Sequence, residues 1–118
     1  DTQWRMWSLY AVADGMLEAQ ILMRAEHLRP RNIRSDSFLE KQKDRIERCL
    51  DEMEARADEL DGPLELAQIT TGVTLSYQDW REWLNDFRPG RPKLTAWYAA
   101  FAERPAMRET EPQETPER

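Results

Sequence analysis

Few side chains in this sequence are suited to nucleophilic or acid–base chemistry, and they do not form a group. His27 is the only histidine and Cys49 the only cysteine among the 118 residues. No serine, cysteine or aspartate close to His27 in the sequence suggests a catalytic pair. A di-iron bundle needs a Glu-x-x-His motif on each of two helices, and zinc sites take several cysteines and histidines. We therefore expect no catalytic residue and no metal ligand within this chain.

Cys49 falls on the apolar stripe of a predicted helix, so we expect a buried thiol without the exposure and lowered pKa that reactivity requires. The acidic residues just after it, Asp51, Glu52 and Glu54, indicate a solvated helix face. The four glycines are not clustered, which excludes a phosphate-binding glycine loop.

Four arginines lie near the end of the first predicted helix, at positions 24, 29, 31 and 34. Guanidinium groups bind carboxylates well, so the cluster could meet an anion. The alternative is an ordinary solvated loop, and the sequence favours that alternative.

The overall charge and hydropathy exclude several classes of protein. Seventeen Lys and Arg stand against 23 Asp and Glu, a net charge of −6, whereas nucleic-acid surfaces usually show the opposite balance. No stretch approaches the roughly 18 uncharged apolar residues that a membrane span needs, and no signal peptide is recognisable. One cysteine cannot form an internal disulfide. We expect a single cytoplasmic domain that binds neither nucleic acid nor membrane.

Residues 2–29 are predicted to form one long helix, because apolar residues recur on it at helical spacing. One stripe runs along Trp4, Trp7, Tyr10, Ala11, Asp14, Leu17, Ile21 and Leu28, and a second along Met6, Leu9, Ala13, Met16 and Met23. A helix with two apolar stripes is covered from two sides. Asp14 lies on an apolar stripe, so we expect it to find a hydrogen-bond partner. Gly15 weakens the helix unless another backbone approaches it closely.

A second helix is predicted from about Ser37 to Leu60, with Ser37 and Glu40 as its capping box. Its core stripe is Leu39, Ile46, Cys49, Leu50, Met53, Ala57 and Leu60. Asp61-Gly62-Pro63 ends it in the usual order. A third helix begins near Leu64 to Leu66 and ends near Trp80, with a core stripe of Leu66, Ile69, Thr70, Val73 and Tyr77.

The remaining segments are shorter. Residues 81–89 are predicted to form a short helix and a turn, 93–103 a last helix, and 108–118 a solvated tail. No segment alternates apolar and polar residues as a strand would. The fold class is therefore all-α, a bundle of about five helices in which the first two are long and antiparallel.

Three segments resemble a known family. They are GPLELAQITTGVTLSYQDWR (62–81), GRPKLTAWYAAFAERPAM (90–107) and WRMWSLYAVADGMLEAQILMRAEHLRP (4–30). Together they are similar to the C-terminal helical domain of bacterial cytosolic glutathione transferases. The resemblance covers residues 1–110 and leaves 111–118 as a flexible tail. One departure is the start of the third helix, where Glu65 and Gln68 replace a Ser/Thr-x-x-Asp cap.

The resemblance implies a function for the chain as half of an enzyme. In this family a preceding thioredoxin-like domain holds glutathione and activates its thiol, so we expect such a domain as a partner, and a homodimer of the whole protein. The helical half would supply one wall of the site for a small apolar electrophile, through Trp7, Tyr10, Ala11 and Asp14. Met6, Leu9 and Met16 would serve the surface toward the other domain or the dimer partner. Trp97 and Phe101 would pack on the central helix.

Two alternatives remain open at this point. Similar helical domains occur as non-catalytic protein-interaction modules, and a stand-alone bundle could bind a small apolar ligand. The whole protein would conjugate glutathione to electrophiles in detoxification or reduce peroxides and disulfides; the isolated chain should do neither. Apolar surface left uncovered in the isolated chain should make it self-associate.

Overall fold

A computed structural model describes residues 2–110, all of whose regular elements are helical. The elements are α1 (Thr2–His27), η1 (Arg31–Ile33), α2 (Asp36–Ala55), η2 (Ala57–Leu60), α3 (Leu66–Trp80), α4 (Pro92–Phe101) and α5 (Pro105–Glu109). The predicted all-α class is confirmed. The predicted tail 111–118 lies outside the described residues.

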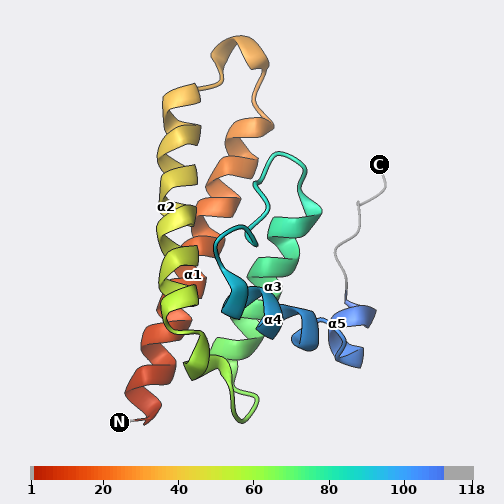
Figure 1. Cartoon of the computed structure of the whole chain (residues 1–118). Helices are drawn as coiled ribbons and strands as arrows, with labels where there is room; N and C mark the ends of the chain where they lie inside the picture. Colours follow the sequence, from red (N-terminus) through yellow and green to blue (C-terminus); the bar gives the residue numbers. More distant parts are fainter. Residues whose placement is uncertain (1, 111–118) are drawn as a thin grey trace.

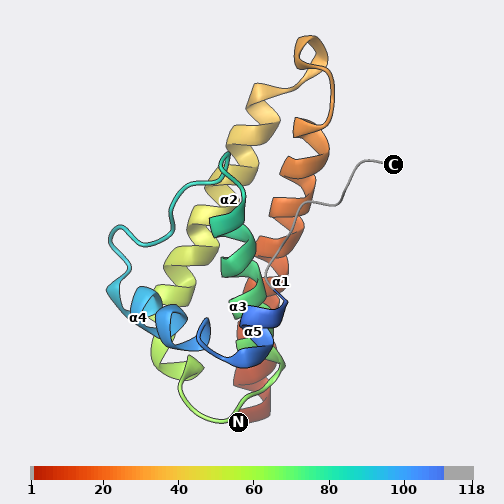
Figure 2. The same cartoon turned by 90° about the vertical axis from the view of Figure 1, so that its right-hand side faces the viewer.

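The two longest helices, α1 and α2, run antiparallel and are joined by residues 28–35 at one end of the molecule (Figure 1). α3 packs beside α1, and α4 lies against η2, α2 and α3. Seen from the side, α3 crosses in front of the α1–α2 pair, with α4 and α5 near the end that carries the N-terminus (Figure 2). The core therefore lies between α1, α2 and α3.

The core face of α1 is its methionine-containing stripe. Leu9, Ala13, Met16, Ala19 and Met23 are all at most 2% exposed. The expectation that Leu9 and Met16 serve an outer surface is wrong, because α2 and α3 pack on the two flanks of this stripe and bury it completely. The other predicted stripe, from Trp4 to Leu28, is the one turned outward.

The start of α2 differs from the prediction by two residues. Ser35 is the N-cap, and its Oγ accepts a hydrogen bond from the Phe38 amide at 3.2 Å. The Ser35 amide in turn donates to the Glu26 carboxylate of α1 at 2.6 Å. This contact fixes the entry to α2, so the predicted box of Ser37 and Glu40 is not used. The core stripe of α2 is confirmed except at Cys49, which is half-buried and not buried as predicted. The α-helix ends at Ala55, and the chain continues to Leu60 as η2.

The helix α3 is turned the opposite way from the prediction. Ala67, Thr71, Gly72, Thr74 and Leu75 are buried, whereas Leu66, Ile69 and Val73 are exposed. Small residues let the α3 backbone approach its neighbours closely, and at Gly72 a Cβ atom would overlap the ring of Phe101 from α4. The packing of α4 aromatics onto α3 is thus confirmed for Phe101, while Trp97 is half-buried and donates its indole N–H to the Leu60 carbonyl at 3.2 Å.

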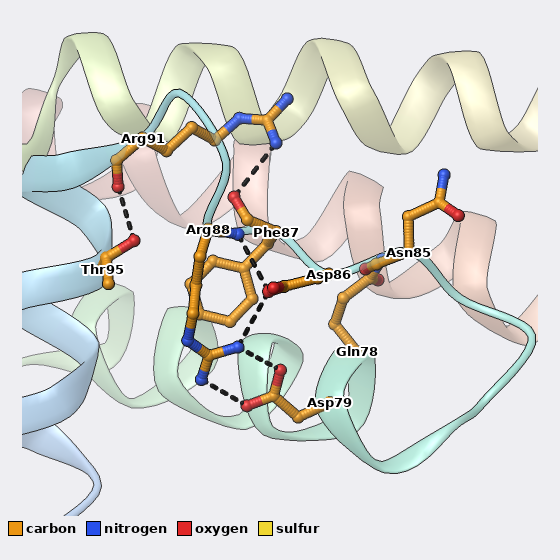
Figure 3. Close-up of polar contacts among 8 residues, drawn as sticks. All are labelled: Gln78, Asp79, Asn85, Asp86, Phe87, Arg88, Arg91 and Thr95. Carbon is orange, nitrogen blue, oxygen red and sulfur yellow. Dashed lines mark hydrogen bonds and ion pairs between the residues drawn. The ribbon is translucent and has the colours of Figure 1, made fainter.

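Residues 81–91 form an irregular turn and not the predicted short helix (Figure 3). Arg88 donates two hydrogen bonds of 2.8 Å to Asp79 and one of 3.0 Å to Asp86. Gln78 donates to the Asn85 carbonyl at 2.9 Å. These side-chain contacts hold the turn, so it does not depend on the hydrogen bonds of a helix.

The buried Arg91 ties this turn to α2. It donates to the Phe87 carbonyl at 3.1 Å and pairs with Glu47 at 2.6 Å and Asp51 at 2.8 Å. The next residue, Pro92, occupies the first position of α4, where a missing amide costs nothing.

The chain also contains α5, which the sequence did not predict, beginning at Pro105 just beyond the end of α4.

Candidate functional site

The predicted site residues lie on the outer side of α1, in its N-terminal half. Trp7 is 48% exposed, Tyr10 is half-buried and Ala11 is exposed. The rings of Trp7 and Tyr10 lie 5.7 Å apart at an angle of 43°. The helix thus brings two aromatic side chains together, with their outward surfaces free to meet another molecule, because residues three apart are neighbours on a helix.

Asp14 lies one turn further along this side of α1, exposed to solvent. Its carboxylate has no hydrogen-bond or ion-pair partner within residues 2–110. The expectation of a structural hydrogen bond was therefore wrong, because the position faces solvent and not the core. The expectation that another backbone approaches Gly15 closely was also wrong. An added Cβ there would be 3.7 Å from the Arg45 side chain and near no backbone of another element.

The line of contact between α1 and α3 is marked by a buried amide. Gln20 is fully buried and donates to the Thr74 carbonyl at 3.1 Å and to Gln78 Oε1 at 2.9 Å. Leu17 and Ile21 flank this line on α1, and Val73 and Tyr77 flank it on α3. Since the core lies on the other side of the line, these flanks belong to one outward surface.

We call this surface the α1–α3 face. It consists of Tyr10, Leu17, Ile21, Leu66, Ile69, Val73 and Tyr77. Ile21 is 56% exposed, Val73 46%, and Leu66 and Ile69 43% each. Several exposed aliphatic side chains on one side of a domain often mark a contact with another molecule or domain. Sequence reasoning placed the α3 residues in the core, although the small residues on the opposite side of α3 were a signal of their true direction.

The arginine cluster forms no common anion site within the described residues. Arg29 pairs with Glu26 at 3.1 Å, and Arg34 donates to the carbonyl oxygens of His27 and Arg29. Two of the four guanidinium groups thus complete the loop after α1, which agrees with the loop interpretation.

The single histidine and cysteine are both partly buried. His27 lies against Trp83, with the ring centres 4.6 Å apart and the ring planes tilted by 31°. Burial, together with the charges of Arg34 and Lys43, lowers the pKa of His27. Burial raises the pKa of the Cys49 thiol despite two nearby arginines. A raised pKa keeps this thiol protonated and unreactive.

The part of the chain that the structure describes holds no group of three or more His, Cys, Asp or Glu side chains placed to bind a metal ion. Nor does any helix within residues 2–110 combine the length and apolar character needed to cross a bilayer.

Comparisons with solved structures give a consistent set of neighbours. A glutathione transferase family member from Pseudomonas fluorescens Pf-5, crystallised with S-(propanoic acid)-glutathione, superposes with a TM-score of 0.89 at 35% sequence identity. The match covers 94% of this chain and 58% of that protein. A glutathione S-transferase from Methylobacillus flagellatus KT, with glutathione bound, gives a TM-score of 0.83 at 28% identity over 92% of this chain and 55% of its own. No protein-family model and no curated protein sequence matches the chain.

Proposed function

We propose that this chain, which shares its fold with the helical C-terminal part of bacterial glutathione transferases, is the substrate-binding half of such an enzyme. The chain spans somewhat more than half the length of the solved relatives. Those relatives are named as transferases and were crystallised with glutathione or a derivative of it. On this proposal glutathione is the co-substrate here too, held mainly by a thioredoxin-like domain joined to this one.

The observation that carries the proposal is the exposed α1–α3 face. Four aliphatic side chains on this face, on α1 and α3, are between 43% and 56% exposed. Burying apolar surface stabilises a contact by about 25 cal/mol per Å², so a domain that covered this face would gain considerable free energy. The proposed thioredoxin-like domain would dock here, and its glutathione would lie near the N-terminal half of α1.

The proposed role of α1 is to form one wall of the site for an apolar electrophile. Trp7 offers a half-exposed indole on which an aromatic ring can stack. Tyr10, beside it, offers a hydroxyl that can donate to a polar group of the substrate or to the glutathione sulfur. Ala11 leaves room between the turns, and the unpaired carboxylate of Asp14 would favour a hydrogen-bond donor on the ligand. The helical half would contribute positioning and exclusion of water.

The test is conjugation of glutathione to a chloronitrobenzene substrate by this chain joined to its thioredoxin-like domain. Trp7→Ala and Tyr10→Phe should raise KM for the electrophile or lower kcat, with KM for glutathione changed little. Leu28→Ala is the matched control, since Leu28 is also an exposed apolar residue but lies just beyond the opposite end of α1. The isolated chain should show no activity.

Failure to conjugate has a defined meaning. If the joined protein binds glutathione but acts on no electrophile, peroxide or disulfide, the proposed enzyme activity is refuted. The alternative function, a non-catalytic interaction module, then remains. Homodimerisation of the joined protein is part of the same proposal, and sedimentation at several concentrations tests it.

A further inference from the structure

Asp14 is the only charged residue of the outward apolar stripe that runs from Trp4 to Leu28. The residues of the α1–α3 face, on both helices, are uncharged as well. The carboxylate of Asp14 is exposed and makes no ion pair within residues 2–110. This side of α1 therefore presents one uncompensated negative charge among apolar side chains.

The next acidic residue of α1 differs from Asp14 in its surroundings. Glu18, four residues later, is turned toward α2, where Arg45 donates to its carboxylate at 3.1 Å. The charge of Glu18 is thus compensated inside the domain. No such partner serves Asp14 in the part of the chain that the structure describes, so a compensating cation has to be brought by another molecule or domain.

Covering this side of the helix would make the charge of Asp14 unfavourable. The domain proposed to dock on the α1–α3 face would displace water from the N-terminal half of α1, where Asp14 lies. A carboxylate that loses water without gaining a partner is strongly destabilising. A cation bound beside Asp14 in the assembled protein would remove that cost.

The side chains next to Asp14 suit an organic cation attached to a ring. Measured along the helix axis, Tyr10 is about 6 Å and Trp7 about 10 Å from Asp14, because each residue adds about 1.5 Å. The two rings are 5.7 Å apart, and Trp7 is 48% exposed. The faces of tryptophan and tyrosine attract ammonium groups and stack on aromatic rings. Ala11, on the same side, is small and leaves space between these groups.

We propose that the assembled enzyme prefers aromatic electrophiles that carry a cationic substituent, such as an ammonium group. The ring of the electrophile would stack on Trp7, and its ammonium would lie between the ring of Tyr10 and the carboxylate of Asp14. The substrate would thus supply the positive charge that this side of α1 lacks. The proposal rests on the proposed transferase function and names the substrates of that same site. It concerns charge and not only hydrogen bonding, so a quaternary ammonium without any N–H should also be preferred.

The experiment compares three electrophiles of one shape, using the chain joined to its thioredoxin-like domain. Each is a 4-chloro-3-nitrobenzene with a one-carbon arm that ends in a trimethylammonium, a tert-butyl or a sulfonate group. In each reaction the glutathione sulfur bonds to the ring carbon, chloride leaves with its electron pair, and the thiol proton passes to solvent. Each kcat/KM is divided by the rate constant of the uncatalysed reaction, which removes the effect of the substituent on reactivity. The cationic substrate should exceed the neutral one about tenfold, and the anionic one should be the poorest.

The variant Asp14→Asn tests the assignment of the charge. It should remove most of the preference for the cation, since the amide keeps the shape of the side chain and loses its charge. Glu18→Gln is the matched control, because Glu18 is an exposed carboxylate of the same helix that already pairs with Arg45. The control should leave the preference unchanged. Equal normalised rates for the cationic and neutral substrates, or a preference that survives Asp14→Asn, would overturn the proposal.

The outcomes separate this proposal from the proposed enzyme function. Conjugation of the neutral substrate without preference for the cation would overturn the selectivity alone, whereas no conjugation of any of the three would overturn both. If Asp14→Asn lowers the melting temperature or raises KM for glutathione but keeps the preference, the carboxylate serves the other domain or the glutathione ammonium, and the proposal is refuted. Should a variant fail to fold, the comparison of the three substrates on the unaltered protein decides.

Discussion

The substitution Gly72→Ala tests the closest packing in the domain. Gly72 lies within α3 and has no positive φ, so alanine can adopt its backbone conformation. An added Cβ would overlap the ring of Phe101 on α4. Phe101 is only 6% exposed, so its ring can move away only by disturbing its neighbours.

The expected magnitude follows from two opposing effects. Alanine is favoured over glycine in a helix interior by about 1 kcal/mol. Overpacking typically costs about 1 to 3 kcal/mol, and a rigid ring in direct overlap places this case in the upper part of that range. The free energy of unfolding should therefore fall by roughly 1 to 2 kcal/mol.

Gly15→Ala is the matched control. Gly15 also lies inside a helix, but its added Cβ would be 3.7 Å from Arg45 Nη2, an ordinary contact with a flexible side chain. It should raise the free energy of unfolding by about 0.5 to 1 kcal/mol. The two glycines should thus differ by roughly 1.5 to 3 kcal/mol although the substitution is identical.

The assay is urea unfolding followed by circular dichroism, with the variants compared at unchanged slope. Adding Phe101→Leu removes the ring edge, so Gly72→Ala should cost less in that background, with an interaction energy of about 1 kcal/mol. If Gly72→Ala stabilises the chain as much as Gly15→Ala does, the packing of α4 on α3 described above is incorrect.

Four further predictions concern caps and ion pairs. Ser35→Ala should cost about 1 kcal/mol in urea unfolding, whereas Ser37→Ala should stay within about 0.5 kcal/mol; equal losses would contradict the cap. Arg91→Met should cost about 1.5 to 3 kcal/mol, since it removes charged hydrogen bonds that hold the turn to α2; a cost near zero would show that the turn does not need them. Glu65→Thr should stabilise the domain by roughly 0.5 to 1 kcal/mol as a better N-cap, and a clear loss on melting would refute the helix start. The amide of Ser35 lowers the pKa of Glu26 in the folded state. The stability from this contact is therefore present above the unfolded pKa of about 4.3 and is lost as pH falls through the lower folded pKa. Glu26→Gln should make the free energy of unfolding depend less on pH in this acidic range, and an unchanged pH dependence would contradict the contact.

The three long helices and the core stripe of α2 were predictable from spacing, because a strongly amphipathic segment buries its apolar side. On α1 spacing gave two apolar stripes, and the buried one was assigned to an outer surface. The buried side of α3 was also predicted wrongly. Its large aliphatic residues and its small residues lie on opposite sides, and periodicity cannot say which side is inside. Within the chain the side of α3 with the small residues is buried, because Gly72 leaves space for the ring of Phe101. The aliphatic side is left exposed, which is where the proposed thioredoxin-like domain would dock.

Other errors came from contacts between distant parts of the chain. Ser35 and Ser37 are both reasonable caps in the sequence, and Glu26 on another helix decides between them. The residues of the turn 81–91 have helical propensity, but Arg88 and Arg91 find carboxylates on α2 and α3 instead. For the candidate site, the sequence located the aromatic pair on α1 but missed the α3 half of the face.

The start of α4 shows how this domain must assemble. Glu54 of α2 accepts hydrogen bonds from the amides of Leu94 at 2.8 Å and Lys93 at 3.3 Å, so α4 is capped by a residue about forty positions earlier in the chain. Such a cap exists only once α2 has taken its place, and a ten-residue helix is marginal by itself. Forming α4 therefore requires closing the long loop between α2 and α4, which has an entropic cost. We expect α4 to form late in folding and to open early, without loss of the α1–α2 pair.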